Sequence, residues 1–327
     1  MIQTVGAWWM WAGFLALVLV MLAVDMLALK SRGAHRVDAR EALLWTLVWI
    51  GLALLFNLAL WWYLGGTLGR DVADRKALEF LTGYLIEKSL AVDNIFVFLM
   101  VFKYFAVPAE YQRRVLVYGV LGAIVMRAVM ILLGSVLITR FHWVIYLFGA
   151  FLVITGIKML VFAGQEPDLT RNPVLRWMRG HLPITTEYHG ERFTVMRDGR
   201  RVFTPLFLVL VLVEVTDLIF AVDSIPAIFA VTTDPFIVFT SNIFAILGLR
   251  AMYFLLADLA ARFHLLKYGL AVILLFVGIK MLLIDTYKIP IGWALGAVFA
   301  ILLTSVFASL WTSRSRAARA HHKQQGE

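Results

Sequence analysis

Apolar residues fall in long blocks along this chain, and short polar segments separate the blocks. About 20 consecutive apolar residues are enough for a helix to cross the hydrocarbon core of a bilayer. Nine blocks reach that length, near 7–29, 43–64, 78–103, 114–138, 141–163, 205–230, 235–257, 265–285 and 290–312. The pattern therefore predicts an all-α, polytopic membrane protein with nine transmembrane helices.

Composition strengthens this prediction and excludes some chemistry. The chain is 62% hydrophobic and 16% charged, whereas soluble domains are nearer half apolar and a quarter charged. The first block is too long for the core of a signal peptide and has no basic segment before it, so we expect no cleavable signal. The sequence has no cysteine, which excludes thiol redox relays and thiolate metal sites.

The net charge of +9 has a distribution that indicates membrane topology. Lys and Arg lie mostly between alternate blocks, at 30–40, 103–114, 164–204, 262–267 and 314–323. Cytoplasmic loops carry the excess of basic residues, which predicts an outside N-terminus and a cytoplasmic C-terminus. The basic charge is thus expected to contact membrane lipids, and we expect no nucleic-acid partner.

An internal repeat relates the third to fifth blocks to the sixth to eighth. Aligning Glu87 with Asp217 also aligns Asp93 with Asp223. The same repeat pairs Arg127 with Arg250 and the two Gly-Ile-Lys-Met segments at 156–159 and 278–281. Each unit has three spans, so the second unit must enter the membrane from the opposite side. The sequence therefore predicts two inverted-topology three-helix repeats, an arrangement that places transporter sites near the midplane.

This repeat divides the chain into six predicted segments. They are peripheral transmembrane helices one and two (1–64), the first repeat (78–163), a cytoplasmic loop (164–204), the second repeat (205–286), transmembrane helix nine (287–313) and a basic cytoplasmic tail (314–327). Within the loop we predict a basic amphipathic helix at 174–182 and a β-hairpin that turns at Asp198-Gly199. The loop is interpreted as a connector, with a regulatory role as the alternative.

Five acids lie inside the predicted spans: Glu87, Asp93, Glu214, Asp217 and Asp223. A charged side chain at a helix centre costs about 2.5–3.5 kcal/mol on insertion scales, so such acids are candidates for a functional site. Asn94, Ser224 and Asn242 could add neutral oxygen ligands, and Lys88, Arg127 and Arg250 could balance charge. Oxygen ligands of these kinds favour Mg²⁺, Ca²⁺ or Mn²⁺. The competing interpretation is that ion pairs such as Glu87 with Arg127 only hold helices together.

Helical spacing separates these acids into two groups. Glu87 and Asn94 are seven residues apart and share a helix face, as do Asp217 and Ser224. Asp93 and Asp223 lie six residues beyond Glu87 and Asp217, about 120° around an ideal helix. We therefore expect Pro226 to kink the sixth span and Asp93 to face that mirrored span. Crowded, buried carboxylates resist ionisation, so one or more could hold a proton when the site is empty and release it to a cation.

Several long motifs resemble the TerC family, and most closely its Alx branch. They are Glu87-Lys-Ser-Leu-Ala-Val-Asp-Asn94, Glu214-x-x-Asp-x-x-Phe-Ala-Val-Asp-Ser-Ile-Pro-Ala227, Thr232-Thr-Asp-Pro-Phe-Ile-Val238 and Ser241-Asn-Ile-Phe-Ala-Ile-Leu-Gly-Leu-Arg-Ala-Met-Tyr-Phe254. The resemblance runs nearly end to end and implies a protein of the bacterial inner membrane that exports Mn²⁺ from the cytoplasm. The five acids above match the acidic positions of the family.

The expected function is export of a divalent metal ion by alternating access, with Mn²⁺ as the transported ion and no cofactor. We expect the cation to bind between the third and sixth spans. Three alternatives remain open: an exporter of a small organic cation or amino acid, an assembly scaffold for metal-handling partners, and an intramembrane aspartyl protease. No Gly-x-Gly-Asp segment accompanies Asp93 or Asp223, so an enzyme is not expected.

Overall fold

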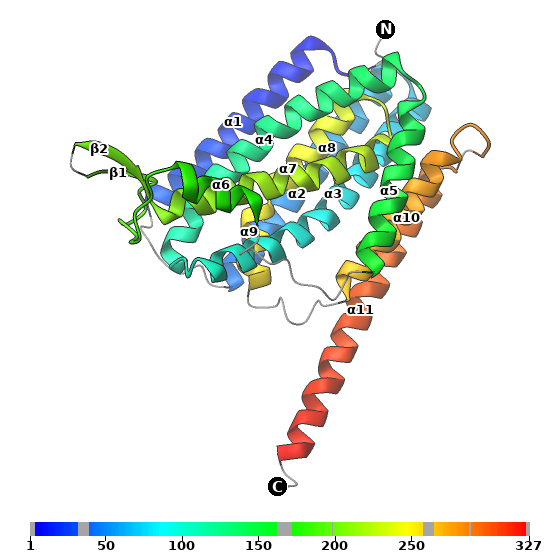
Figure 1. The fold of residues 1–327 in the computed structure, drawn as a ribbon. Coiled ribbons are helices and arrows are strands. Elements are labelled where there is room, and N and C mark those ends of the chain that lie inside the picture. The colour runs from blue at the N-terminus through cyan, green and yellow to red at the C-terminus, as the bar shows by residue number, and fades with distance from the viewer. Residues whose placement is uncertain are drawn as a thin grey trace.

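Helices make up most of the computed structural model, which describes residues 4–31, 39–161, 172–197, 199–257, 265–287 and 289–324. Figure 1 shows a bundle of long helices, with α5, α10 and α11 grouped along one side. The helices are α1 Trp8–Ser31, α2 Ala39–Thr67, α3 Arg70–Tyr104, α4 Ala109–Arg140, α5 Val144–Val161, α6 Pro173–His181, α7 Pro205–Phe229, α8 Pro235–Leu247, α9 Leu249–Ala257, α10 Leu266–Leu282 and α11 Ile291–Gln324.

Six helical segments in the described part of the chain are long and apolar enough to cross a membrane. They are Arg40–Thr67, Ala109–Arg140, Val144–Val161, Pro205–Phe229, Pro235–Ala257 and Ile291–Ser309, and Trp8–Val24 is a shorter apolar helix. The structure therefore confirms a polytopic, mainly α-helical membrane protein. Nine spans, and the direction in which each crosses, stay predictions.

Packing between the two predicted repeats is reciprocal. Helix α3 packs on α8 as α4 packs on α7, while α3 contacts α7 and α5 contacts α10. Gly149 and Gly278 meet where α5 crosses α10, and Gly156 lies against the carbonyl of Ala271. The alignment of the Gly-Ile-Lys-Met segments makes these two contacts equivalent. Two halves related by a two-fold axis would pack in this way, and small residues allow such close approach of helices.

The second repeat contains one proline inside a helix and one interruption between helices. Helix α7 continues through Pro226 to Phe229, so the kink expected at this proline does not end the helix. The predicted seventh span is apolar enough to cross a membrane over Pro235–Ala257, and within it α8 ends at Leu247 and α9 begins at Leu249. The discontinuity of this repeat therefore falls at Gly248.

The segment between the repeats forms a small helix and a hairpin at one end of the bundle (Figure 1). Helix α6 begins after Asn172, whose side-chain oxygen accepts hydrogen bonds from the backbone N–H groups of Val174 and Leu175, an ordinary N-cap. Strands β1 Thr194–Arg197 and β2 Arg200–Phe203 pair antiparallel. Gly199 has φ of 74°, which suits glycine in a tight turn, while Asp198 lies outside the described residues.

Candidate functional site

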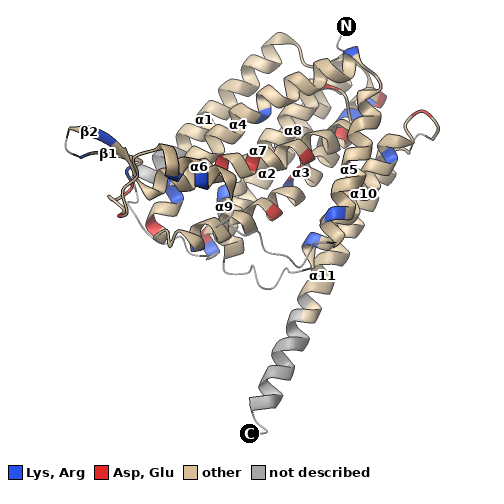
Figure 2. Ribbon diagram, viewed as in Figure 1, with Lys and Arg blue, Asp and Glu red and all other residues tan. Residues whose placement is uncertain are grey.

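Arg127 of α4 lies at the centre of a buried polar cluster. Its side chain is fully buried and forms ion pairs with Glu87 of α3 and Asp217 of α7. The Asp217 carboxylate accepts from Nη2 at 3.2 Å and from Nε at 3.4 Å. Figure 2 shows acidic segments of α3 and α7 within the body of the bundle, away from its ends. One acid from each repeat thus meets a single guanidinium, and the three groups sum to −1 when all are ionised.

Neutral side chains complete the central cluster, which comprises Glu87, Asn94, Arg127, Asp217, Ser224 and Asn242. The amide of Asn94 donates to Asp217 Oδ1 at 3.1 Å, and the amide of Asn242 donates to Glu87 Oε2 at 3.2 Å. Arg127 Nη1 also reaches Ser224 Oγ at 3.4 Å and Asn242 Oδ1 at 3.3 Å. Each carboxylate therefore has one guanidinium and one amide as donors.

Asn94 contributes an oxygen that has no donor. Its Oδ1 atom is buried and finds no hydrogen-bond partner among the described residues. A buried polar atom without a partner costs about 1–3 kcal/mol, and such an atom in a native fold calls for an explanation such as an ion or a water molecule. An amide oxygen beside a carboxylate is also a suitable ligand for a hard cation.

A narrow cavity of about 10 Å³ borders Asp217 on the side of α3 that carries Phe98. This volume is close to the space that one water molecule needs. Its other lining residues are apolar or glycine: Leu116, Gly119, Val120, Ala123, Val213, Ile246 and Leu249. The central cluster is therefore adjacent to a cavity that a bare ion or one water fits and a larger solute does not.

Helix geometry explains which predicted acids meet. Glu87 and Asn94 share one face of α3, and Asp217 and Ser224 share one face of α7, because seven residues are close to two turns. Asp223 points away from this face, where it accepts a hydrogen bond of 3.2 Å from Thr155 of α5 and lies near the charge of Lys158. Half-buried Asp223 is thus directed toward the α5–α10 side of the bundle.

The other two acids also lie outside the central cluster. Asp93 interacts electrostatically with Lys267 at the start of α10, in place of the contact expected with the mirrored helix. Glu214 lies against Gly122 of α4, where a Cβ atom would overlap its carboxylate. Within the described ranges, no three Asp, Glu or His side chains are close enough to hold a metal ion. In this conformation the five acids do not form one site.

Of the predicted charge-balancing residues, Arg127 pairs with two carboxylates, whereas Lys88 has a backbone carbonyl as its partner. Lys88 is half-buried, and its ammonium donates to the carbonyl of Ala245 at 3.3 Å, in the last turn of α8. Gly248 leaves room for this ammonium and for Trp49. A cation at a helix C-terminus satisfies free carbonyls and complements the helix dipole. Lys88 thus stabilises the end of α8, while Arg250 lies in the first turn of α9.

We expect Lys88→Met to lower the free energy of unfolding by about 1–3 kcal/mol, because the buried carbonyl of Ala245 loses a charged donor. Thermal unfolding of the purified protein in detergent measures this change. Lys103→Met is the matched control, since Lys103 is exposed on the same helix and its removal should change the free energy by about 0.5 kcal/mol or less. Equal stability of the two variants would contradict the assignment.

A second polar cluster, which the sequence analysis missed, lies at the end of the bundle that holds the N-terminus. Lys76 bridges Glu79 at 2.8 Å and Asp234 at 3.3 Å. Thr232 donates to Glu79 at 2.5 Å, and Asp234 accepts from the hydroxyl of Thr4 at 2.9 Å. Asp234 also caps the N-terminus of α8. We call these five residues the Lys76 cluster; it ties the first residues of the chain to α8.

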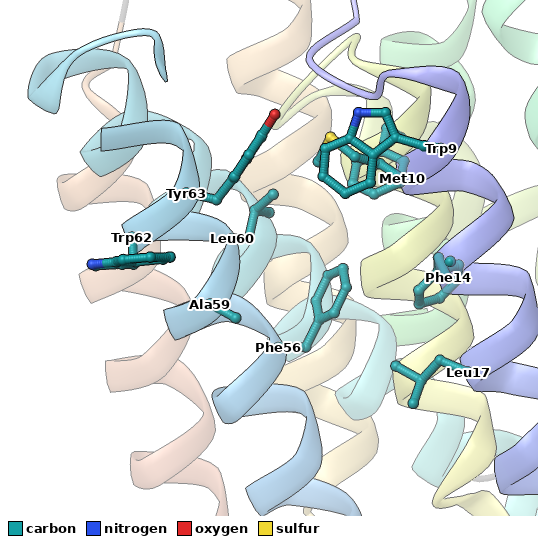
Figure 3. Close-up of a pocket in the computed structure, with 11 residues that line it drawn as sticks. Trp9, Met10, Phe14, Leu17, Phe56, Ala59, Leu60, Trp62 and Tyr63 are labelled. Carbon is teal, nitrogen blue, oxygen red and sulfur yellow. The ribbon is translucent and has the colours of Figure 1, made fainter. Parts of the chain in front are cut away.

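The larger cavity, drawn in Figure 3, is apolar. One of its lining residues, Phe236, donates its backbone N–H to Asp234 of the Lys76 cluster. It has a volume of about 350 Å³ and lies between α1 and α2, with Phe236 of α8 also in its lining. The lining residues are Trp9, Met10, Gly13, Phe14, Leu17, Phe56, Ala59, Leu60, Trp62, Tyr63 and Phe236. None of these side chains carries a charge, so this cavity is not a candidate site for an ion.

Comparison with known proteins places this architecture in a family. Residues 72–317 match the model of the integral membrane protein TerC family. The chain is 59% identical over 324 residues to Alx of Shigella flexneri, which is described as a proposed membrane-bound redox modulator, and the match covers 99% of this chain and 100% of that protein. Alx of Escherichia coli strain K12 is also 59% identical, with 99% of both chains covered.

A more distant relative, an uncharacterised membrane protein of Myxococcus xanthus, is 49% identical over 95% of both chains. No solved structure matches the chain. The family match covers both repeats, including every residue of the central cluster. The chain therefore belongs to the TerC family of integral membrane proteins.

Proposed function

We propose that this protein exports a hard divalent cation, Mn²⁺ in the first instance, from the cytoplasm across the bacterial inner membrane. The observation that carries the proposal is the central cluster, in which Glu87 and Asp217 come from opposite repeats and converge at Arg127. Transporters built from inverted repeats bind their substrates at such an interface. Buried carboxylates in a membrane protein mark ion pathways.

The chemistry of the cluster supports an inorganic ion over the alternatives. Its ligands are carboxylate, amide and hydroxyl oxygens, which favour hard cations. An organic cation or amino acid would need a larger pocket beside the acids, whereas the cavity next to Asp217 has a volume of about 10 Å³. The described relatives are named as redox modulators, but a chain without cysteine cannot act through thiol exchange.

Metal uptake into inverted membrane vesicles tests the proposal. We expect the vesicles to accumulate Mn²⁺ in a saturable manner when they contain this protein, and not when they lack it. Parallel assays with Mg²⁺, Ca²⁺ and Zn²⁺ define selectivity, and imposed pH gradients test coupling to protons. Absence of flux for all four metals under every gradient, from protein that is folded and inserted, would falsify the proposal.

A further inference from the structure

We infer that Arg127 is a built-in competitor of the transported cation: it occupies the carboxylates of the central cluster in the empty protein and releases Asp217 when the cation binds. The inference rests on the proposed function and assigns Arg127 a part in setting cation affinity and release. It follows from the position of Arg127, from its long contacts with Asp217, and from the charge of the cluster.

Arg127 occupies the place between the two repeats where the transported cation is expected to bind. Its guanidinium is fully buried and contacts an acid from each repeat. A guanidinium does not lose its proton in proteins, so the positive charge is permanent even at this depth. Arginine thus keeps one positive charge between the two buried carboxylates at every physiological pH.

Arg127 holds Asp217 by long hydrogen bonds. Its Nη2 and Nε atoms lie 3.2 and 3.4 Å from the oxygens of the Asp217 carboxylate. Hydrogen bonds between N–H groups and oxygen normally fall between about 2.7 and 3.2 Å. Asp217 is therefore held weakly, and Arg127 can release it without breaking a short hydrogen bond.

Asp217 is also the carboxylate that a cation can reach. It borders the narrow cavity, and its hydrogen-bond partner Asn94 presents the buried oxygen that lacks a donor. A cation at this position would gain a carboxylate and an amide oxygen while Arg127 stays with Glu87. Asp217 and Asn94 are therefore assigned to the binding position, and Glu87 to holding Arg127.

The charge of the central cluster indicates how Arg127 would change the affinity for the cation. Glu87, Arg127 and Asp217 sum to −1 in the empty protein, and a divalent cation changes the sum to +1. The bound cation and the guanidinium repel each other across a few ångströms in a medium of low dielectric constant. Binding is thereby weakened, and release on the far side of the membrane is eased. Removing Arg127 should tighten binding and slow transport.

The test compares Arg127→Gln with Arg127→Lys in the full-length protein. Mn²⁺ binding is measured in detergent by equilibrium dialysis, and transport is measured in vesicles. We expect Arg127→Gln to bind Mn²⁺ at least about tenfold more tightly than the wild type, because one like charge is lost, and to transport it at least about tenfold more slowly. Arg127→Lys keeps the charge and should stay near the wild-type affinity.

Ion pairing that only holds the helices together predicts a different result. Arg127→Gln would then bind Mn²⁺ no more tightly than the wild type, and this result overturns the inference while leaving the proposed function intact. If Arg127→Gln cannot be purified in a folded form without metal, we expect Mn²⁺ in the purification buffers to restore the yield of folded protein. Failure with and without Mn²⁺, while Arg127→Lys folds, also overturns the inference. A wild-type protein that does not transport any metal would remove the proposed function itself.

Discussion

Mn²⁺ transport should fall by about 100-fold or more when Asp217 is replaced by Asn, because outer-sphere partners of metal sites alone contribute 10–100-fold and a direct ligand contributes at least as much. Asparagine has nearly the same shape as aspartate but no charge. Its introduction leaves Glu87 and Arg127 as a neutral pair, with no anion free to receive the cation. Initial rates of uptake into inverted vesicles over a range of Mn²⁺ concentrations measure the loss.

The matched control is Asp71→Asn, which removes an exposed acid near the start of α3 and should leave transport unchanged. Folding of Asp217→Asn is expected to persist, since Arg127 keeps its ion pair with Glu87. Thermal unfolding in detergent verifies this. Transport by Asp217→Asn with the rate and concentration dependence of the wild type would exclude Asp217 as a ligand.

Among the described residues, six of the nine spans predicted from hydropathy are helical segments long and apolar enough to cross a membrane, because burial in lipid imposes one composition on a whole span. Hydropathy failed where the backbone changes without a change in composition. Residues 235–257 are mostly apolar on both sides of Gly248, so the interruption between α8 and α9 left no hydropathic signal. Conversely, the first predicted residue of the third span is 78, whereas α3 begins at Arg70. The polar residues before position 78 are part of α3, because helical backbone hydrogen bonding begins before the apolar segment.

The repeat predicted part of the site for a definite geometric reason. Seven-residue spacing on two continuous helices put Glu87 with Asn94 and Asp217 with Ser224, and those faces meet in the structure. The separation of Asp93 from Glu87 also follows from spacing. Which helix supplies the partners of Asp93 and Asp223 depends on tertiary packing. The contact of Asp223 with Thr155 therefore could not be derived from local sequence.

The sequence indicates the Lys76 cluster less clearly than the central cluster. Asp234 followed by Pro235 is a typical start of a helix, with a capping side chain and proline at the first position, and the structure has this cap. The partner residues gave no such indication. Thr4 and Asp234 are 230 residues apart in the chain, and nothing in either segment identifies the other.

The Lys76 cluster leads to the second large effect, a loss of stability in Lys76→Met. Glu79 and Asp234 are both buried. Removing the ammonium that bridges them deprives both acids of their ion pair, while the electrostatic interaction of Glu79 with Lys280 remains. Breaking a buried ion pair on one side typically costs about 3–5 kcal/mol; the Lys76 side chain is 18% exposed, so we expect about 3 kcal/mol, at the low end of that range. Thermal unfolding in detergent measures the change.

Two variants control for other effects of the substitution. Lys76→Arg keeps a cation between Glu79 and Asp234 and should retain most of the stability, whereas Arg75→Met removes an exposed neighbouring charge and should change the free energy by about 0.5 kcal/mol or less. If Lys76→Met unfolds at the same temperature as Arg75→Met, the bridge does not contribute to stability.

The same substitution should release the start of the chain, because Asp234 holds both the hydroxyl of Thr4 and the backbone N–H of Val5. Since the protein has no cysteine, Ala7→Cys provides a single thiol for labelling. A maleimide that cannot cross membranes should label this thiol several-fold faster in Lys76→Met than in Arg75→Met. Labelling in intact cells, before permeabilisation, would also place the N-terminus outside, as the distribution of basic residues predicts. Labelling only after permeabilisation would contradict this predicted orientation.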